Sequence, residues 1–191
     1  MMLSDFEAKL VGVAEGEFRS FNGIHEADEP LASRIPLYWE AVGQPFPGVD
    51  TPWSAVFVSW CLKQAGAKTS EFLFAAAHSR FVHWAINNAE TNRGLFRAFP
   101  FREVSPAVGD LVQWNQPGNT FDFAHAEAHA QYPSHSAIVV ATGQDASGRF
   151  VQTIGGNEGD SVRRTRIQLD HTGLIAERKR QSFISVVQTL K

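Results

Sequence analysis

Apolar residues in the first half of the chain recur every three to four positions, which is the period of a helix with one buried face. The run Ser4-Asp5-Phe6-Glu7 has the residue types of a capping box and predicts the start of a first helix. Further helices are predicted from Ser33 to Val42, from Trp53 or Ser54 to a terminating Gly66, and from about Ala76 to Asn88.

After residue 108 the pattern changes to the alternation that is typical of strands. The expected strands are Asp110–Asn115, Ser136–Thr142, Phe150–Ile154, Ser161–Leu169 and Phe183–Leu190. The segment 118–131 fits either a loop or a short helix. Helices followed by a run of antiparallel strands predict the α+β class, with N-terminal helices packed on a central antiparallel β-sheet.

Length, charge and the lack of long apolar stretches limit the number of domains and the kinds of partner that we expect. A chain of 191 residues suits one domain over 1–191, with a helical part over 1–50 and the third helix and the strands over 51–191. The net charge is −3 and there is no dense Lys/Arg cluster, so we expect no nucleic-acid partner. No apolar stretch is long enough to cross a bilayer, so we expect no membrane insertion. The N-terminus lacks a Sec signal pattern, so we expect synthesis in the cytoplasm and any export by a specialised secretion system or by lysis.

The single cysteine, Cys61, excludes an intramolecular disulfide and a Cys-rich zinc site. It lies two turns into the third helix on the apolar face, far from the helix N-terminus that would stabilise a thiolate. We therefore expect a buried structural cysteine.

Ser54 stands at the start of the third helix and has two interpretations. Serine is a preferred N-cap residue, which would make its role structural. The same position places a hydroxyl beside unpaired backbone N–H groups, which can stabilise a developing oxyanion. The two interpretations compete for the same Ser54 oxygen, which either caps the helix or takes part in the reaction.

Among the seven histidines, His135 is the strongest candidate for chemistry, because it opens a predicted strand and can be held rigidly against a facing helix. Alternatively it is a solvent-facing residue at a strand end. His78 lies just before or inside the fourth helix and lines a groove or caps the helix. His125 and His129 have zinc-like spacing only if their segment is helical, and we expect no metal and no cofactor.

The run Gly155-Gly156-Asn157-Glu158 follows a predicted strand. Its composition alone predicts a turn. In a functional interpretation the turn aims Asn157 at His135 and fixes the tautomer of the imidazole.

Many short pieces of this sequence, in this order, match one family of bacterial proteins of unknown function. They are Tyr38-Trp39, Pro52-Trp53-Ser54-Ala55, Ser59-Trp60, Ala65-Gly66, His78-Ser79, Val108-Gly109-Asp110-Leu111, Pro133-Ser134-His135 and Ile154-Gly155-Gly156-Asn157. The chain resembles the DUF2272 family, which in turn looks like a branch of the NlpC/P60 and CHAP cell-wall peptidases and amidases.

This resemblance implies a papain-like fold in which Ser54 occupies the position of the nucleophilic cysteine, His135 that of the base and Asn157 that of the orienting residue. It also implies cleavage of amide bonds in peptidoglycan, and we expect Trp53 and His78 to contact the substrate. Serine departs from the usual cysteine and needs full general-base assistance, because a hydroxyl is not ionised near neutral pH.

Three hypotheses follow. In the first, the protein is a serine-based hydrolase of peptidoglycan or its peptide fragments, used as a secreted antibacterial effector or a phage lysis protein, with an immunity, chaperone or adaptor protein as a further partner. In the second, it is a catalytically inactive domain of the same fold that binds peptidoglycan or a protein. In the third, His125, His129 and His135 form a metallohydrolase site.

Overall fold

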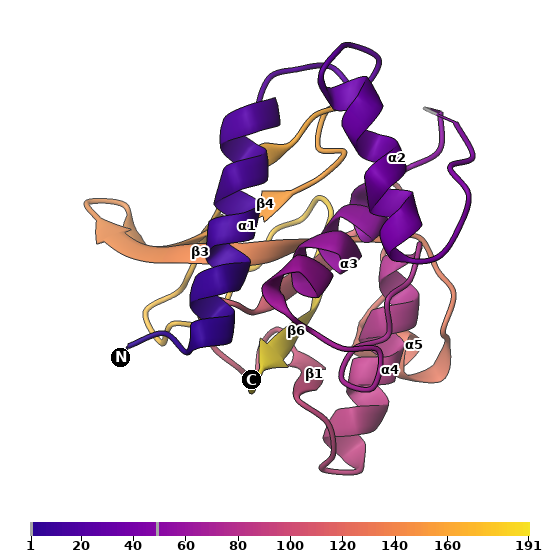
Figure 1. Cartoon of the computed structure of the whole chain (residues 1–191). Coiled ribbons are helices and arrows are strands. Elements are labelled where there is room, and N and C mark those ends of the chain that lie inside the picture. The colour runs from indigo at the N-terminus through magenta and orange to yellow at the C-terminus, as the bar shows by residue number, and fades with distance from the viewer. Residues whose placement is uncertain (1, 49) are drawn as a thin grey trace.

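The computed structural model describes residues 2–48 and 50–191 and shows helices packed on one six-stranded antiparallel sheet (Figure 1). The helices are α1 (Asp5–Phe21), α2 (Leu31–Ala41), α3 (Ser54–Ala65), α4 (His78–Glu90) and the short α5 (Phe123–Ala128). The strands are β1 (Phe96–Pro100), β2 (Leu111–Asn115), β3 (Ser134–Asp145), β4 (Gly148–Gly155), β5 (Arg163–Gln168) and β6 (Phe183–Thr189). The predicted α+β class is confirmed at this level.

The helix ends agree closely with the sequence pattern. The capping box of α1 is formed, because the Ser4 hydroxyl accepts from the Glu7 N–H while the Glu7 carboxylate accepts from the Ser4 N–H. Helix α3 ends before Gly66, whose φ of 103° is favourable only for glycine. The Ser4 hydroxyl also donates to the Lys191 carbonyl at 2.7 Å, so the two chain ends lie together.

The strand order is β1-β6-β2-β3-β4-β5. The predicted meander is present from β2 to β5, and β6 returns to pair with the other side of β2. Strand β1 was not predicted, because it is a short edge strand that ends in a proline and has no clear alternation. The open segment 118–131 contains the helix α5, which Asp122 caps by accepting from the His125 N–H.

Each face of the sheet is covered, which explains why every residue of β2 is buried, including the polar Gln113 and Asn115. Leu111 and Ile138 face the core shared with α1, α3 and α4. Val112 and Val139 point to the opposite face, where Leu169 and Ile175 from the loops complete a second cluster. In the cartoon, α1 and α3 cross in front of the long strand β3 (Figure 1).

Within the described residues, none of the helices combines the length and the apolar character that a membrane span requires.

Candidate active site

Helix α3 begins at Ser54, and the hydroxyl of Ser54 lies 2.7 Å from Nε2 of His78. The N-cap position belongs to Trp53, whose side chain makes no capping hydrogen bond. Ser54 is therefore the first helical residue rather than the cap, and its oxygen is committed to an imidazole instead of a first-turn N–H. This placement removes the capping interpretation of Ser54, and Trp53 provides no side-chain acceptor for the first-turn N–H groups.

His78 is the first residue of α4 and is only 4% exposed. Burial lowers the pKa of its imidazole well below 6.5, and the neighbouring His135 lowers it further. Its Nδ1 is buried and has no hydrogen-bond partner in the part of the chain that the structure describes. Because an orphaned buried N–H is rarer than an orphaned lone pair, this environment favours the neutral tautomer with its proton on Nε2. In that tautomer His78 donates to Ser54 Oγ, and the Ser54 proton is left for another acceptor.

His135 is the second residue of β3 and pairs across the sheet with Trp114 of β2. Its ring lies 4.6 Å from the Trp114 ring and 5.1 Å from the His78 ring, measured between centroids. Nε2 of His135 contacts the Glu158 carboxylate at 3.1 Å, and the Thr165 hydroxyl donates to the other oxygen of Glu158 at 2.7 Å. With Nε2 donating to a carboxylate, Nδ1 carries the free lone pair of this imidazole.

Glu158, rather than Asn157, makes the orienting contact with His135. The side-chain amide of Asn157 turns the other way and donates to Glu26 at 2.8 Å. The cause is local, because Asn157 has a φ of 55° in a tight turn, which sends successive side chains in different directions. The run forms the predicted turn, but the turn aims Glu158 at His135 and directs the Asn157 amide to Glu26.

Trp53 has no exposed surface, so it cannot touch a bound substrate in this structure. Its ring stacks on Tyr38 at 5.7 Å, and its indole N–H donates to Glu26 at 2.7 Å. Glu26 therefore joins the residue before Ser54 to the turn that carries Glu158. Trp53 supports the start of α3 instead of lining a cleft.

The two glycines before Asn157 allow this turn to approach α3. A Cβ on Gly156 would lie 2.5 Å from the Trp53 ring and 2.7 Å from Phe57. A Cβ on Gly155 would lie 2.2 Å from the Glu158 carboxylate. Any larger residue at either position would displace the helix start or the carboxylate.

Ser54 and His135 line the same cleft, of about 460 Å³, together with Trp114, Glu158 and Arg178. Ser54 and His78 also line a smaller cavity of about 130 Å³. Gln116 lines both, and its amide donates to the Ser134 carbonyl at 3.3 Å. The candidate nucleophile and base are thus open to one ligand-sized space.

The remaining candidates lie elsewhere. Cys61 is fully buried, and burial raises the pKa of its thiol, which confirms a structural cysteine. His125 of α5 stacks at 4.2 Å on His129, the residue that follows this helix, and also on Phe121, which precedes it. Among the described residues, no group of three or more His, Cys, Asp or Glu side chains gathers in a metal-binding arrangement.

A family model described as an uncharacterized protein conserved in bacteria (DUF2272) matches residues 25–188. The chain belongs to the DUF2272 family. The matched region includes Glu26, Ser54, His78, His135 and Glu158. Comparisons of this DUF2272 chain with curated proteins and with solved structures find no significant match.

Sequence reasoning missed Glu158 and Glu26 in this DUF2272 chain. Glu158 is adjacent to Asn157, and a carboxylate next to a predicted orienting residue was a signal that could have been weighed. Glu26 lies in a polar loop far from the other site residues along the chain, and no local pattern distinguishes it.

Proposed function

We propose that this DUF2272 protein is a serine hydrolase that cleaves amide bonds in bacterial peptidoglycan. The proposal includes a papain-like fold of the NlpC/P60 and CHAP type, in which Ser54 is the nucleophile and His135 the general base. Glu158 takes the orienting role that the motif comparison gave to Asn157. The single observation that carries the proposal is one cleft lined by a hydroxyl at a helix start and by an imidazole that a carboxylate holds.

In the proposed acylation step, Ser54 Oγ attacks the carbonyl carbon of the scissile amide and its proton passes to Nδ1 of His135. The Glu158 carboxylate accepts from Nε2 and stabilises the imidazolium that forms. His135 then gives the proton to the leaving amine as the C–N bond breaks. Water, deprotonated by the same imidazole, hydrolyses the acyl-serine and restores both residues.

The oxyanion of the tetrahedral intermediate needs donors that are fixed before the reaction. The first-turn N–H groups of α3 lie beside Ser54 and receive no cap from the Trp53 side chain. The positive end of the helix dipole also lies there. Gln116, which lines the cleft and the smaller cavity, is a second candidate donor.

Serine can replace cysteine in this arrangement because two buried groups assist it. His78 donates to Ser54 Oγ and fixes its rotamer, which directs the hydroxyl proton away from His78. A carboxylate-oriented His135 supplies the base that an un-ionised hydroxyl requires.

Peptidoglycan as the substrate rests on the resemblance to cell-wall hydrolases. The proposal also includes delivery to a periplasm or cell wall by a specialised secretion system or by lysis, and an immunity, chaperone or adaptor partner. The alternative to the hydrolase is a catalytically inactive domain that binds peptidoglycan or a protein partner.

Incubation of the purified protein with sacculi tests the proposal, with chromatography of the released muropeptides. We expect wild type to release fragments and Ser54→Ala to release none. Ser59→Ala is the matched control, because Ser59 belongs to the same helix but bonds to Ala75, and it should retain release. Binding to sacculi without release by wild type would favour the inactive domain. Equal release by wild type and Ser54→Ala would reject Ser54 as the nucleophile.

A further inference from the structure

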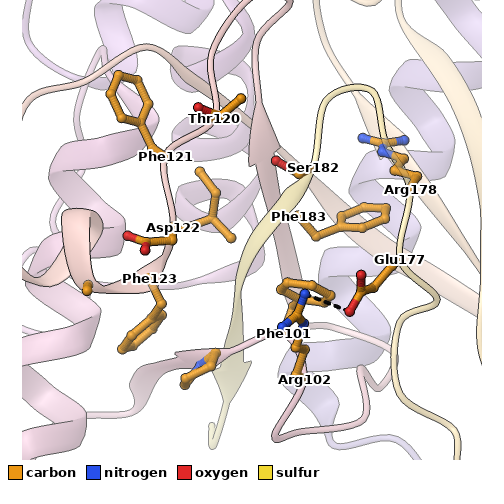
Figure 2. A pocket seen from close by; sticks show the side chains of 13 residues that line it. Phe101, Arg102, Thr120, Phe121, Asp122, Phe123, Glu177, Arg178, Ser182 and Phe183 are labelled. Carbon is orange, nitrogen blue, oxygen red and sulfur yellow. Dashed lines mark ion pairs between the residues drawn. The ribbon is translucent and has the colours of Figure 1, made fainter.

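Arg178 lies in the loop between β5 and β6 and lines two neighbouring cavities. One is the cleft that contains Ser54 and His135. The other has a volume of about 340 Å³ and is walled by aromatic residues that include Phe121 and Phe183. Figure 2 shows this second cavity, with the Arg178 guanidinium beside the Phe183 ring at one end.

The guanidinium is held in place mainly by aromatic rings. Its central carbon lies 4.1 Å from the Phe183 ring centroid and 5.4 Å from that of Trp114. Nε donates to the Gln181 carbonyl at 2.7 Å. Nη2 is screened from solvent and has no hydrogen-bond partner within residues 2–48 and 50–191. Burial lowers the pKa of Arg178, and the negative charge of Glu158 partly offsets this effect.

The acidic groups around Arg178 are engaged with other partners. Glu177 forms an ion pair with Arg102 at 2.6 Å, which Figure 2 also marks. Asp122 caps α5, and Glu158 is occupied by His135 and Thr165. Partly burying a cation without a carboxylate partner raises the free energy of the folded protein. An anion that binds beside the cation offsets this increase.

We propose that Arg178 binds a carboxylate of the substrate and so selects peptides with a free carboxylate close to the scissile bond. The inference rests on the proposed function, because it uses the same cleft. Trp114 connects Arg178 to the base, since its ring lies 4.6 Å from the His135 ring centroid and 5.4 Å from the central guanidinium carbon. A carboxylate on the guanidinium therefore lies in the same part of the cleft as the base. A planar guanidinium offers parallel N–H donors to a carboxylate, which a primary amide cannot accept equally well.

NMR titration of isotopically labelled Ser54→Ala protein tests this inference without turnover. The two probes are N-acetyl-D-alanyl-D-alanine and its C-terminal primary amide. We expect the carboxylate form to shift the Arg178 Nε signal and to bind roughly 10- to 100-fold more tightly than the amide. Adding Arg178→Gln to the Ser54→Ala protein should abolish this preference. The matched control adds Arg180→Gln, at an exposed arginine of the same loop, and should keep the preference.

A thermal melt of each variant confirms that it is folded, and Arg178→Lys, which keeps the charge, should retain part of the preference. Equal binding of the two probes, no binding of either, or a preference that survives Arg178→Gln would overturn the inference. The sacculus assay separates this result from the proposed function. If wild type releases fragments but shows no carboxylate preference, the hydrolase proposal is supported and the Arg178 inference is overturned. If the protein prefers the carboxylate probe but releases no fragments, the Arg178 site is supported and the hydrolase proposal is rejected.

Discussion

The Ser54 hydroxyl and Nε2 of His78 lie 2.7 Å apart, and both residues are almost completely buried. This pair joins the start of α3 to the start of α4. Since burial keeps His78 neutral, its role in the proposed reaction is to position Ser54 and not to remove its proton.

Replacing His78 separates positioning from proton transfer. His78→Gln retains a side-chain N–H donor, and we expect kcat to fall less than in His78→Leu, which removes the hydrogen bond. The loss in His78→Leu should be about 10- to 100-fold, which corresponds to one misplaced hydrogen bond at the nucleophile. Steady-state kinetics on a soluble muropeptide measure both variants. If Gln and Leu lower kcat equally, the hydrogen bond to Ser54 does not contribute.

Glu158 and Asn157 are adjacent, and their predicted contributions differ. Glu158→Gln replaces the acceptor of the His135 N–H by an amide and should lower kcat by at least about a hundredfold, since the wrong tautomer is then stabilised. Asn157→Ala removes a contact to Glu26, so it should lower the melting temperature and leave kcat close to that of wild type. Parallel kinetics and thermal melts distinguish the two. A large fall in kcat for Asn157→Ala with little change for Glu158→Gln would show that Asn157 orients His135.

Glu26 is expected to stabilise the site mechanically. Glu26→Ala leaves the buried indole N–H of Trp53 and the amide of Asn157 without their acceptor. The free energy of unfolding should fall by about 1–3 kcal/mol. Chemical denaturation measures this change, and Glu29→Ala, in the same polar loop, is the matched control, because the Glu29 carboxylate accepts from the exposed Ser33 hydroxyl. An unchanged unfolding free energy for Glu26→Ala would show that the two hydrogen bonds do not hold the loop.

The lowered pKa of His78 predicts a pH dependence of stability. The unfolded chain binds a proton at His78 below about pH 6.5, whereas the folded protein does not, so the free energy of unfolding should fall on acidification. One such proton contributes up to about 1.4 kcal/mol per pH unit. His78→Gln should show a shallower fall in denaturation series between neutral and mildly acidic pH. Parallel curves for the two proteins would contradict this prediction.

The comparison of wild type with His78→Gln is needed because the titration of Asp110 changes the free energy of unfolding in the opposite direction. Burial raises the pKa of Asp110 from 3.8 to about 7, so the folded protein binds the extra proton in that interval. Stability contributed through Asp110 is lost as the pH rises towards 7. Only the difference between wild type and His78→Gln isolates the histidine.

The periodic parts of this fold could be predicted from the sequence. The capping box at Ser4, the start of α3 and its end at Gly66 follow from local residue preferences, and each was found. Strand β1 could not be predicted, because its pairing with β6 joins residues far apart in the chain and its own pattern is weak. Local patterns carry no information about such a partner.

The candidate site was predictable in part. Ser54 and His135 were singled out by their places at the starts of a helix and a strand, and they line one cleft. The partner of the Ser54 hydroxyl, His78, and the partner of the His135 ring, Glu158, depend on side-chain directions. Those directions follow from the tertiary packing of α4 and from a left-handed residue in the turn after β4, which no sequence period encodes.

The most direct test of the proposed nucleophile is mass spectrometry of the intact protein and its peptides after treatment with a fluorophosphonate. We predict one covalent adduct on Ser54 in wild type, and a strongly reduced rate of labelling in His135→Ala. An unlabelled Ser54 in wild type, or equal labelling rates in wild type and His135→Ala, would contradict a serine nucleophile activated by His135.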